Sequence, residues 1–445
     1  MTTYVHALEF DTEKCAGRLR CVRVCPTHAI RVKKGKVRVS SSLCIDCGNC
    51  LVACPEGTIK PRTDSWEDVE KFKFKVAIVS PTLFGQFPVA IKPAHIIDGL
   101  LAIGFDAVHD ISIESELINI AIQDYLDEYD GPLPLISSTC PVVVRLIQVA
   151  YPDMVGQIIP IEPPREIAGR EARKRYSEEL GIAPKDIGVI YITPCPAKIV
   201  SIKQPAEGAP SNLDLAIGIN DLYNPLLSAI THRERDERAG KIVRSKTGLH
   251  GISFLHMALT GGQSRELSRI RPMSVAQLPN IIRVFEDIEK GKLRNIDFIE
   301  AYSCTAGCIG GAFTVDERFV ARAKIYQLVK EAQDGSEHVS REAARLYKKG
   351  EYFIRQQFKP RPIQGRRIDW TEKIRRIKAK EEFVKLLPRI DCSLCGAPTC
   401  EVFAEDVANG RSKPEDCVLV GENRLELLRK IYAMDYPEIT RESED

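Results

Sequence analysis

Residues 301–311 read AYSCTAGCIGG, a stretch that places Cys304 and Cys308 four residues apart. Three glycines surround the second cysteine: Gly307, Gly310 and Gly311. The spacing suits two thiolates that bind one metal cluster. Because glycine has no side-chain bulk, the glycines indicate that a large group lies against the main chain. The other ligands must come from elsewhere among the chain's 15 cysteines.

The chain has 445 residues, enough for two to four domains, and its 44% hydrophobic and 28% charged residues are ordinary for a globular protein. The formal net charge of +2 argues neither for nor against nucleic-acid binding. No nucleotide-binding glycine loop of the Walker or Rossmann kind is present, so no nucleotide cofactor is predicted. We also predict no nucleic-acid partner. No apolar run is long enough to span a membrane, and the N-terminus lacks the features of a signal peptide. We therefore predict a cytoplasmic protein without a membrane partner.

The cysteines occur in groups. Seven lie within residues 15–54, two at positions 140 and 195, two at 304 and 308, and four within 392–417. Disulfides are not expected, because cytosolic thiols stay reduced. Short spacings indicate metal ligands, whereas free thiols are the alternative interpretation.

The N-terminal group contains a full bacterial ferredoxin motif, Cys44-x2-Cys47-x2-Cys50-x3-Cys54, followed by proline. In two-cluster ferredoxins, the last cysteine of each motif binds the other cluster. One [4Fe-4S] cluster is therefore predicted on four thiolates: Cys25, Cys44, Cys47 and Cys50. Zinc is the alternative, but two motifs that both end in Cys-Pro favour iron and sulfur.

The preceding motif is incomplete, because Arg18 stands where its second cysteine belongs. The second site has Cys15, Cys21 and Cys54 but no fourth thiolate. A three-iron cluster, a [4Fe-4S] cluster with a non-cysteine ligand, and no cluster all remain open. The stretches HAIRVK and KVRVS predict a small hairpin. Nine Lys and Arg residues within 14–38 suit either an acidic electron-carrier partner or a solvated surface.

Residues 392–417 contain a second ligand pattern, Cys392-x2-Cys395-Gly-x3-Cys400-x16-Cys417. We expect a short helix through Ala404–Ala408 that ends at Gly410, after which the chain returns with the fourth thiolate. The pattern resembles the small [4Fe-4S] domain appended to several redox and sensory proteins. A four-cysteine zinc site is the alternative.

Residues 75–310 alternate apolar with helical stretches, which predicts an α/β domain. The strand-like stretches are KVAIVSPTL, AVHDIS, LPLISST and DIGVIYITP. Cys140, Cys195, Cys304 and Cys308 fall at strand ends or in the following loops, where α/β sheets usually place their sites. Four thiolates from three loops could hold one buried [4Fe-4S] cluster.

Three loops of this region, which spans residues 75–312, resemble signature motifs of the [FeFe]-hydrogenase family. The family's Thr-Ser-Cys-Cys-Pro motif appears as Ser137-Ser-Thr139-Cys140-Pro. Its Pro-Cys-x-x-Lys motif appears as Pro194-Cys195-Pro-Ala-Lys198, and its Cys-x-x-x-Cys motif with glycines appears as Cys304–Gly311.

The resemblance implies a role for each matching residue. Cys140, Cys195, Cys304 and Cys308 would bind the [4Fe-4S] part of an H-cluster. Cys308 would also bridge to a diiron subsite that carries CO, cyanide and a dithiolate. Lys198 would donate a charge-assisted hydrogen bond to a cyanide, and a plain surface charge is the alternative.

Several positions depart from the family's pattern. Thr139 replaces the proton-transferring cysteine of efficient members, and a hydroxyl is a poor acid or base near neutral pH. Ala121 and Ile122 stand near the places of two relay glutamates, which Asp124 or Glu116 would replace only if the geometry allows. Further replacements near the expected cluster are Thr193, Ser201, Tyr302 and the pair Ala312-Phe313.

We therefore predict a sensory-type [FeFe]-hydrogenase that catalyses H₂ ⇌ 2H⁺ + 2e⁻ with low turnover. Its catalytic residues would be Thr139, Lys198 and Cys308, and its cofactors three to four [4Fe-4S] clusters and a diiron subsite. Electrons would pass to a ferredoxin-like carrier or a signalling partner. The alternative is a hydrogenase-like electron-transfer or scaffold protein without the diiron subsite.

The predicted organisation is multidomain and of the α/β class. A small α+β ferredoxin-like domain is expected at residues 1–62, and the α/β hydrogenase-like domain at 73–314. A helical linker or arm is expected at 315–385, a small C-terminal [4Fe-4S] domain at 386–425, and a tail at 426–445.

Overall fold

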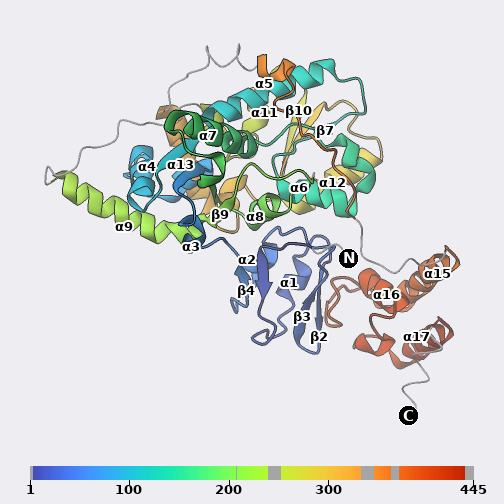
Figure 1. Ribbon diagram of the computed structural model, residues 1–445. Coiled ribbons are helices and arrows are strands. Elements are labelled where there is room, and N and C mark those ends of the chain that lie inside the picture. The colour runs from blue at the N-terminus through green and yellow to red at the C-terminus, as the bar shows by residue number, and fades with distance from the viewer. Residues whose placement is uncertain (1–3, 207, 239–251, 332–344, 362–369, 436–445) are drawn as a thin grey trace. The chain divides into compact units, whose positions relative to one another are not determined.

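The computed structural model describes residues 4–206, 208–238, 252–331, 345–361 and 370–435 (Figure 1). The chain forms two units, each assembled from separate segments. Unit 1 comprises Met1–Leu8, Ile45–Gly48 and Pro61–Arg361, and unit 2 comprises Glu9–Cys44, Asn49–Lys60 and Pro362–Asp445. Among the described helices, none is long and apolar enough to cross a bilayer.

Unit 1 contains a four-stranded sheet in the order β6-β5-β8-β9, and every neighbouring pair is parallel. Strand β8 is buried along its whole length, which explains why its sequence is continuously apolar. The strands are β5 (Phe74–Val79), β6 (Ala107–Asp110), β8 (Ile187–Thr193) and β9 (Leu215–Gly218).

A second parallel sheet of unit 1 has the order β10-β11-β7. Its strands are β7 (Leu135–Ile136), β10 (Pro272–Ala276) and β11 (Phe298–Tyr302). The predicted α/β class is confirmed. Strands β9, β10 and β11 were not predicted, because β9 is short and polar residues such as Ser274 and Glu300 interrupt the other two.

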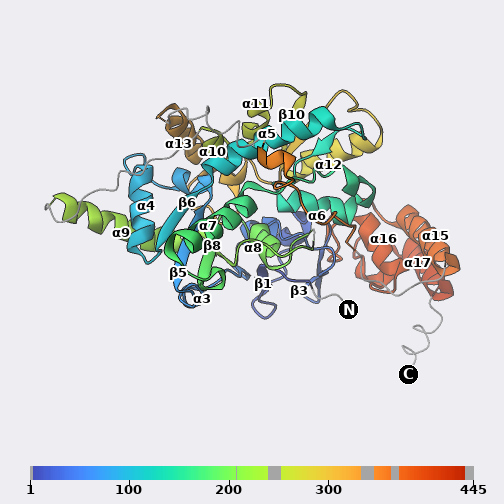
Figure 2. The same cartoon turned by 45° about the horizontal axis from the view of Figure 1, so that its top comes forward.

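Helices connect the parallel strands, as crossover connections require. Helix α7 packs against β5, β6 and β8 (Figure 2). Helices α8 and α9 pack against β9. The α-helices of unit 1 are α3 (Trp66–Val69), α4 (Pro93–Ala102), α5 (Ser112–Glu128), α6 (Pro141–Ala150), α7 (Pro164–Leu180), α8 (Pro196–Lys203), α9 (Ile219–Arg238), α10 (Ile252–His256), α11 (Gly262–Glu266), α12 (Leu278–Glu289) and α13 (Arg318–Glu331). The 3₁₀ helices are η1 (Pro81–Gln86), η2 (Pro152–Gln157), η3 (Pro184–Asp186) and η4 (Cys308–Gly310).

The ferredoxin-like part of the chain contains the predicted hairpin. Strands β2 (Ile30–Lys33) and β3 (Lys36–Val39) pair antiparallel, and Lys34 and Gly35 both have positive φ angles, 49° and 73°, in the turn. Such a two-residue turn matches the twist of the strands. The other elements are β1 (Leu8–Phe10), which pairs with β4 (Ile59–Pro61), and the helices α1 (Arg20–Arg23) and α2 (Asn49–Ala53).

The C-terminal part of unit 2 is helical and larger than predicted. It consists of α15 (Trp370–Leu386), α16 (Cys400–Ala408), η5 (Pro414–Asp416) and α17 (Glu422–Asp435). The predicted boundary at 425 lies inside α17, whose Leu428 and Tyr432 share a core with Phe383 and Phe403. Residues 426–435 therefore belong to this core rather than to a tail, because their apolar face is buried. Residues 436–445 lie outside the described residues.

The prediction of a single helical linker or arm at 315–385 is also wrong. In unit 1, α13 buries Ala321 and Ile325, and Tyr352 belongs to the core that contains α5. In unit 2, α15 buries Ala379 and Phe383 in the C-terminal core. Because this stretch is highly charged, its sequence did not predict these buried apolar residues. They pack in two different cores. Residues 332–344 and 362–369 of this region lie outside the described ranges.

Candidate functional site

Each of the four cysteines of the predicted hydrogenase-like domain follows the carboxyl end of a parallel strand. Cys140 follows β7, Cys195 follows β8, and Cys304 and Cys308 follow β11. Cys140 and Cys195 are also the N-cap residues of α6 and α8, each of which begins with a proline. The partial positive charge at a helix N-terminus stabilises a thiolate or an anionic cluster at these positions.

Side-chain contacts and the mutual electrostatic effects of the thiols together indicate that the four thiols lie close to one another. Ser303 Oγ lies 3.7 Å from Cys140 Sγ and 3.6 Å from Cys304 Sγ. Burial raises the pKa of Cys195 to about 11, and the thiolates of Cys140 and Cys308 act in the same direction. Burial and the neighbouring thiolates also raise the pKa of Cys304. The structure therefore brings together the four cysteines that the sequence grouped.

This arrangement fits an iron–sulfur cluster. Four thiolates in one buried place repel each other and lose their hydration, so they need a bound cation to become charged. Iron ions supply that charge, and metal binding then releases the thiol protons. Soft thiolate ligands are the usual choice for iron–sulfur clusters.

Lys198 lies inside this site. Its side chain is buried, and its Nζ lies 3.5 Å from Cys308 Sγ and 3.5 Å from the Tyr191 hydroxyl. Burial lowers the pKa of Lys198, but the negative charges of Cys308, Tyr191 and Cys195 outweigh burial and raise it above the ordinary value. The interpretation of Lys198 as a plain surface charge is therefore wrong.

The glycines around Cys308 have a different cause from the predicted one. A Cβ on Gly307, whose φ is 101°, would lie 2.5 Å from the carbonyl oxygen of Ala258. A Cβ on Gly310 would meet the carbonyl oxygen of Thr305 at 2.2 Å, and one on Gly311 would meet that of Pro194 at 2.4 Å. These glycines let protein backbones approach each other. They are not an indication of a bulky bound group.

Three residues that replace the family's usual ones form hydrogen bonds in the region of the four cysteines. The Thr193 hydroxyl lies 3.1 Å from the Cys195 carbonyl oxygen and accepts from the Cys195 N–H at 3.2 Å. The Tyr302 hydroxyl donates to the Met257 carbonyl oxygen at 3.2 Å. The Ser201 hydroxyl accepts from Arg165 at 3.3 Å. Thr193 thus positions the backbone of a ligand cysteine, Cys195.

Asp124, one of the two residues considered as a substitute in the relay, pairs with a residue other than Thr139. Ala121 and Ile122 are buried in an apolar core, and Asp124 forms an ion pair with Arg269 at 2.9 Å. The Thr139 hydroxyl instead lies 3.1 Å from that of Ser137.

A polar network continues from Ser137 away from Thr139. The Ser137 hydroxyl lies 3.0 Å from Gln263 Oε1, and the Gln263 N–H donates to Glu300 at 3.2 Å. Sequence reasoning missed this network, because these residues lie far apart in the chain and no motif links them.

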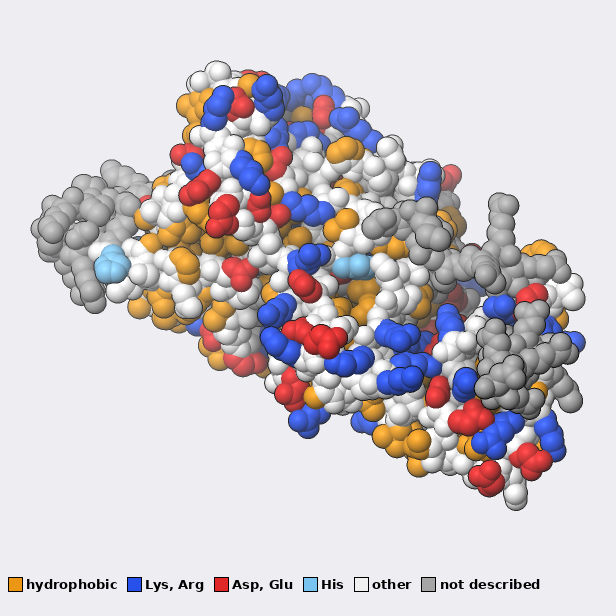
Figure 3. Space-filling model, turned by 60° about the horizontal axis from the view of Figure 1, so that its bottom comes forward, with side chains coloured by type: hydrophobic (Ala, Val, Ile, Leu, Met, Phe, Trp, Pro, Cys, Tyr) orange, Lys and Arg blue, Asp and Glu red, His pale blue; other side chains and the backbone are white. Residues whose placement is uncertain are grey.

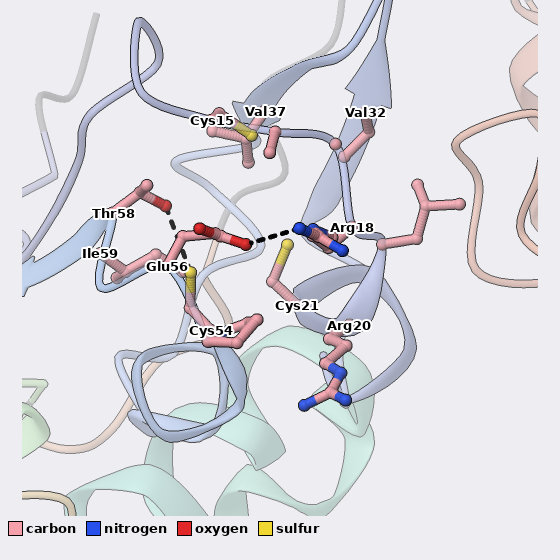
Figure 4. A pocket seen from close by; sticks show the side chains of 14 residues that line it. Cys15, Arg18, Arg20, Cys21, Val32, Val37, Cys54, Glu56, Thr58 and Ile59 are labelled. Atoms are coloured by element: carbon pink, nitrogen blue, oxygen red, sulfur yellow. Dashed lines mark hydrogen bonds and ion pairs between the residues drawn. The ribbon is translucent and has the colours of Figure 1, made fainter.

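In the ferredoxin-like part, Cys15, Cys21 and Cys54 line one cavity together with Arg18 (Figure 4). Burial raises the pKa of Cys50 to about 12, and the Cys25 and Cys21 thiolates contribute.

Cys47 lies on the 45–48 segment that belongs to unit 1. The adjacent Gly48 packs so closely that its Cβ would meet Ala312 at 2.7 Å and Pro196 at 3.2 Å. Cys47 is thus next in sequence to a residue that contacts the Cys195 and Cys308 loops.

The four C-terminal cysteines also converge. Burial raises the pKa of Cys395 to about 11, with Cys417 and Cys392 contributing, and the charges of Cys400 and Cys392 help to raise that of Cys417. The predicted helix is present as α16, which begins at Cys400 under a Thr399 cap.

The C-terminal ligand loop packs on the ferredoxin-like part within unit 2. The Val32 N–H donates to the Gly396 carbonyl oxygen at 3.1 Å, and Arg23 donates to the Cys392 carbonyl oxygen at 2.8 Å. Arg31 also forms an ion pair with Asp406, whose side chain is 4% exposed.

Internal acids neutralise much of the predicted basic module. Ion pairs join Lys14 to Asp11, Arg18 to Glu56, Arg31 to Asp406, Lys33 to Asp416 and Lys36 to Glu13. Figure 3 shows Lys and Arg side chains interspersed with Asp and Glu on the face that it draws. These pairs weaken the interpretation of the module as a docking surface for an acidic carrier.

Comparison with known families identifies the metal groups. The family described as iron only hydrogenase large subunit, C-terminal domain, matches residues 73–312. A 4Fe-4S dicluster domain family matches residues 7–55, and an Fe-S cluster family matches residues 387–419. Iron–sulfur clusters, rather than zinc, are therefore the cofactors of this chain.

Individual relatives are distant. The NADP-reducing hydrogenase subunit HndD of Solidesulfovibrio fructosivorans is 26% identical over 243 residues, which are 47% of this chain and 42% of that protein. Iron hydrogenase 1 of Clostridium pasteurianum is 23% identical over 250 residues, 48% of this chain and 44% of that protein. The match thus spans less than half the length of these relatives.

A solved structure of an [FeFe]-hydrogenase HydA1 variant from Chlamydomonas reinhardtii shares 18% identity and covers 62% of this chain and 89% of its own, with a TM-score of 0.45. That likeness is too low to support an argument. The family match, by contrast, spans more than half of the 445 residues. The protein belongs to the iron-only, or [FeFe]-, hydrogenase large-subunit family.

Proposed function

We propose that this protein carries out reversible hydrogen oxidation at an H-cluster with low turnover, in a sensing or regulatory role. One observation supports the proposal most strongly: a buried lysine, Lys198, lies 3.5 Å from the thiol of Cys308 within a group of four converging cysteines. A [4Fe-4S] cluster needs only the thiolates. A buried ammonium group, by contrast, is stabilised when an anionic ligand is bound beside it.

In this proposal, Cys140, Cys195, Cys304 and Cys308 hold the [4Fe-4S] part, and Cys308 also holds the diiron subsite. When bound, the diiron subsite supplies the metal at which H₂ is cleaved heterolytically. Lys198, which lies 3.5 Å from the Tyr191 hydroxyl, would donate a hydrogen bond to a cyanide of this group.

Electrons would leave through the ferredoxin-like module. The supporting contact is the close packing of Gly48 against Pro196 and Ala312, because Cys47 precedes Gly48 and Cys195 precedes Pro196. A metal bound by Cys47 would then lie close to one bound by Cys195.

Low turnover follows from Thr139. Its hydroxyl bonds to Ser137, and a hydroxyl with a pKa far above that of a thiol transfers protons poorly near neutral pH. Slow conversion suits a protein that reports hydrogen rather than one that produces it in bulk.

A second candidate function is an electron-transfer or scaffold protein that keeps the four cysteines without the diiron subsite. Two observations favour it: the glycines near Cys308 are explained by backbone packing, and a cytosolic Fe-S cluster assembly factor NAR1 homolog of Schizosaccharomyces japonicus is 33% identical over 64 residues.

One spectrum separates the two candidates. We expect the anaerobic iron–sulfur protein, supplied with a preassembled diiron precursor, to show infrared bands of bound CO and cyanide. A Cys308→Ser variant, which loses the bridging thiolate, should show none. Absence of the bands from the wild-type protein would exclude hydrogen chemistry and favour the second candidate.

A further inference from the structure

The cavity around Cys15, Cys21 and Cys54 is also lined by an acidic residue, which lies just outside the four-cysteine motif. Glu56 follows the Cys54-Pro55 pair and lines the same cavity, whose volume is about 390 Å³ including the space open to solvent. Figure 4 shows its carboxylate among the three thiols, directed toward Arg18. The distance from Arg18 Nη2 to Glu56 Oε1 is 3.1 Å.

The three thiols of Cys15, Cys21 and Cys54 line the same cavity. Cys54 Sγ lies 3.2 Å from the Thr58 hydroxyl, a contact that favours its thiolate. Three thiolates can hold three irons of a cluster, but the fourth iron of a [4Fe-4S] core needs another ligand.

Arg18 cannot supply that ligand, because a guanidinium stays protonated and has no acceptor atom. Glu56 can, because a carboxylate oxygen coordinates ferrous iron. Glu56 carries the sole carboxylate among the described residues that line this cavity. Its ion pair with Arg18 joins side chains that are 38% and 66% exposed, so little free energy opposes its opening.

We propose that this site reversibly binds ferrous iron, with Glu56 as the fourth ligand and Arg18 as its competitor. The reaction is [3Fe-4S]⁰ + Fe²⁺ ⇌ [4Fe-4S]²⁺. The iron forms bonds to three sulfides and to the Glu56 carboxylate, and the ion pair to Arg18 opens. No electron is transferred. The site does not depend on hydrogen chemistry elsewhere in the chain.

The test follows the three-iron signal by electron paramagnetic resonance in the full chain. We expect mild oxidation with ferricyanide to produce the signal of an oxidised three-iron cluster. Reduction with dithionite and addition of Fe²⁺ should then remove that signal on reoxidation, once the fourth iron has bound.

Three variants identify the ligand. Glu56→Gln keeps the side-chain size but should need at least about tenfold more Fe²⁺ for half conversion. Arg18→Gln removes the competitor and should need less than the wild type. Arg18→Cys completes the thiolate set and should give no three-iron signal after the same oxidation.

Glu13→Gln is the matched control, because Glu13 is an exposed acid of the same unit that pairs with Lys36. It should convert like the wild type. The signals of the remaining clusters report whether each variant is folded. Equal conversion of Glu56→Gln and wild type, or a wild type without a three-iron signal, would overturn the proposal.

Discussion

In the proposed function, Thr139 occupies the place of the proton-transferring cysteine. Its hydroxyl bonds to Ser137, and the polar contacts continue through Gln263 to the buried carboxylate of Glu300. Glu300 in turn accepts from the Ser264 N–H at 2.9 Å and the Ser274 hydroxyl at 3.0 Å. The network positions Thr139, but a hydroxyl at its start remains a weak acid.

We predict that Thr139→Cys raises hydrogen turnover, because a thiol titrates much closer to neutral pH than a hydroxyl. The expected gain is on the order of 10²–10⁴ for one added acid–base group. Hydrogen evolution by protein with equal diiron content, judged by infrared intensity, measures it. Thr139→Ser is the control and should stay at the wild-type rate. An unchanged rate in the cysteine variant would place the relay elsewhere.

At the scale of elements, the loops that carry the ligands depend on close backbone contacts. The loop after β11 lies against residues 258–260, which is why Gly307 adopts a φ of 101°. In unit 2, the loop before α16 lies against β2 in the same manner, and a Cβ on Gly396 would meet the Val32 carbonyl oxygen at 1.7 Å.

Gly307→Ala should destabilise unit 1, because alanine strains this φ and its Cβ would lie 2.5 Å from the Ala258 carbonyl oxygen. Strain of about 2–3 kcal/mol lowers the unfolding midpoint by roughly 5–10 °C. Anaerobic thermal unfolding measures the change. Gly156→Ala is the control, because nothing lies within 4 Å of its Cβ position. A midpoint equal in both variants would contradict the close contact.

The buried ion pair between Arg31 and Asp406 should hold α16 on the hairpin. We predict that Arg31→Gln costs up to about 3 kcal/mol, because it leaves a buried carboxylate with fewer partners, although Arg411 also pairs with Asp406. The double variant with Asp406→Asn should lose less than the sum of the two single variants. Thermal unfolding measures each, and exposed Arg38→Gln is the control. Additive losses would mean that the pair does not couple these elements.

At the scale of the whole molecule, unit 2 joins segments from both ends of the chain. The contacts from Arg23 to Cys392 and from Val32 to Gly396 bring the C-terminal ligand loop beside the ferredoxin-like part. Val32 also lines the cavity of the three-cysteine site. A cluster on the C-terminal cysteines would therefore lie close to one at that site.

We predict a magnetic interaction between these two clusters in the dithionite-reduced protein, visible as broadened or split paramagnetic resonance signals. Cys395→Ser, which removes a ligand of the C-terminal cluster, should simplify the signals of the N-terminal clusters. Arg38→Gln should leave them unchanged. Identical N-terminal signals in the wild type and in Cys395→Ser would show that the clusters are far apart.

The sequence was informative wherever ligands lie at short spacing. Cys392, Cys395 and Cys400 could be grouped from their separations alone, and the hairpin from its two apolar stretches and the Lys34-Gly35 turn. The arm and tail predictions failed, because charged helices such as α15 and α17 bury only a few apolar residues each. The glycine interpretation failed, because the partner of each glycine is backbone from a distant segment.

By itself, the sequence determined the α/β class, the family and the grouping of the cysteines, because each of these follows from local patterns of residue type and spacing. Only the tertiary structure decided that Lys198 is buried against Cys308, that Glu56 lies among three thiols, and that residues 9–44 and 370–435 share one unit. Those facts depend on contacts between segments far apart in the chain. The side chains of these segments come into contact only when the sheets and loops pack. No local sequence pattern predicts such contacts.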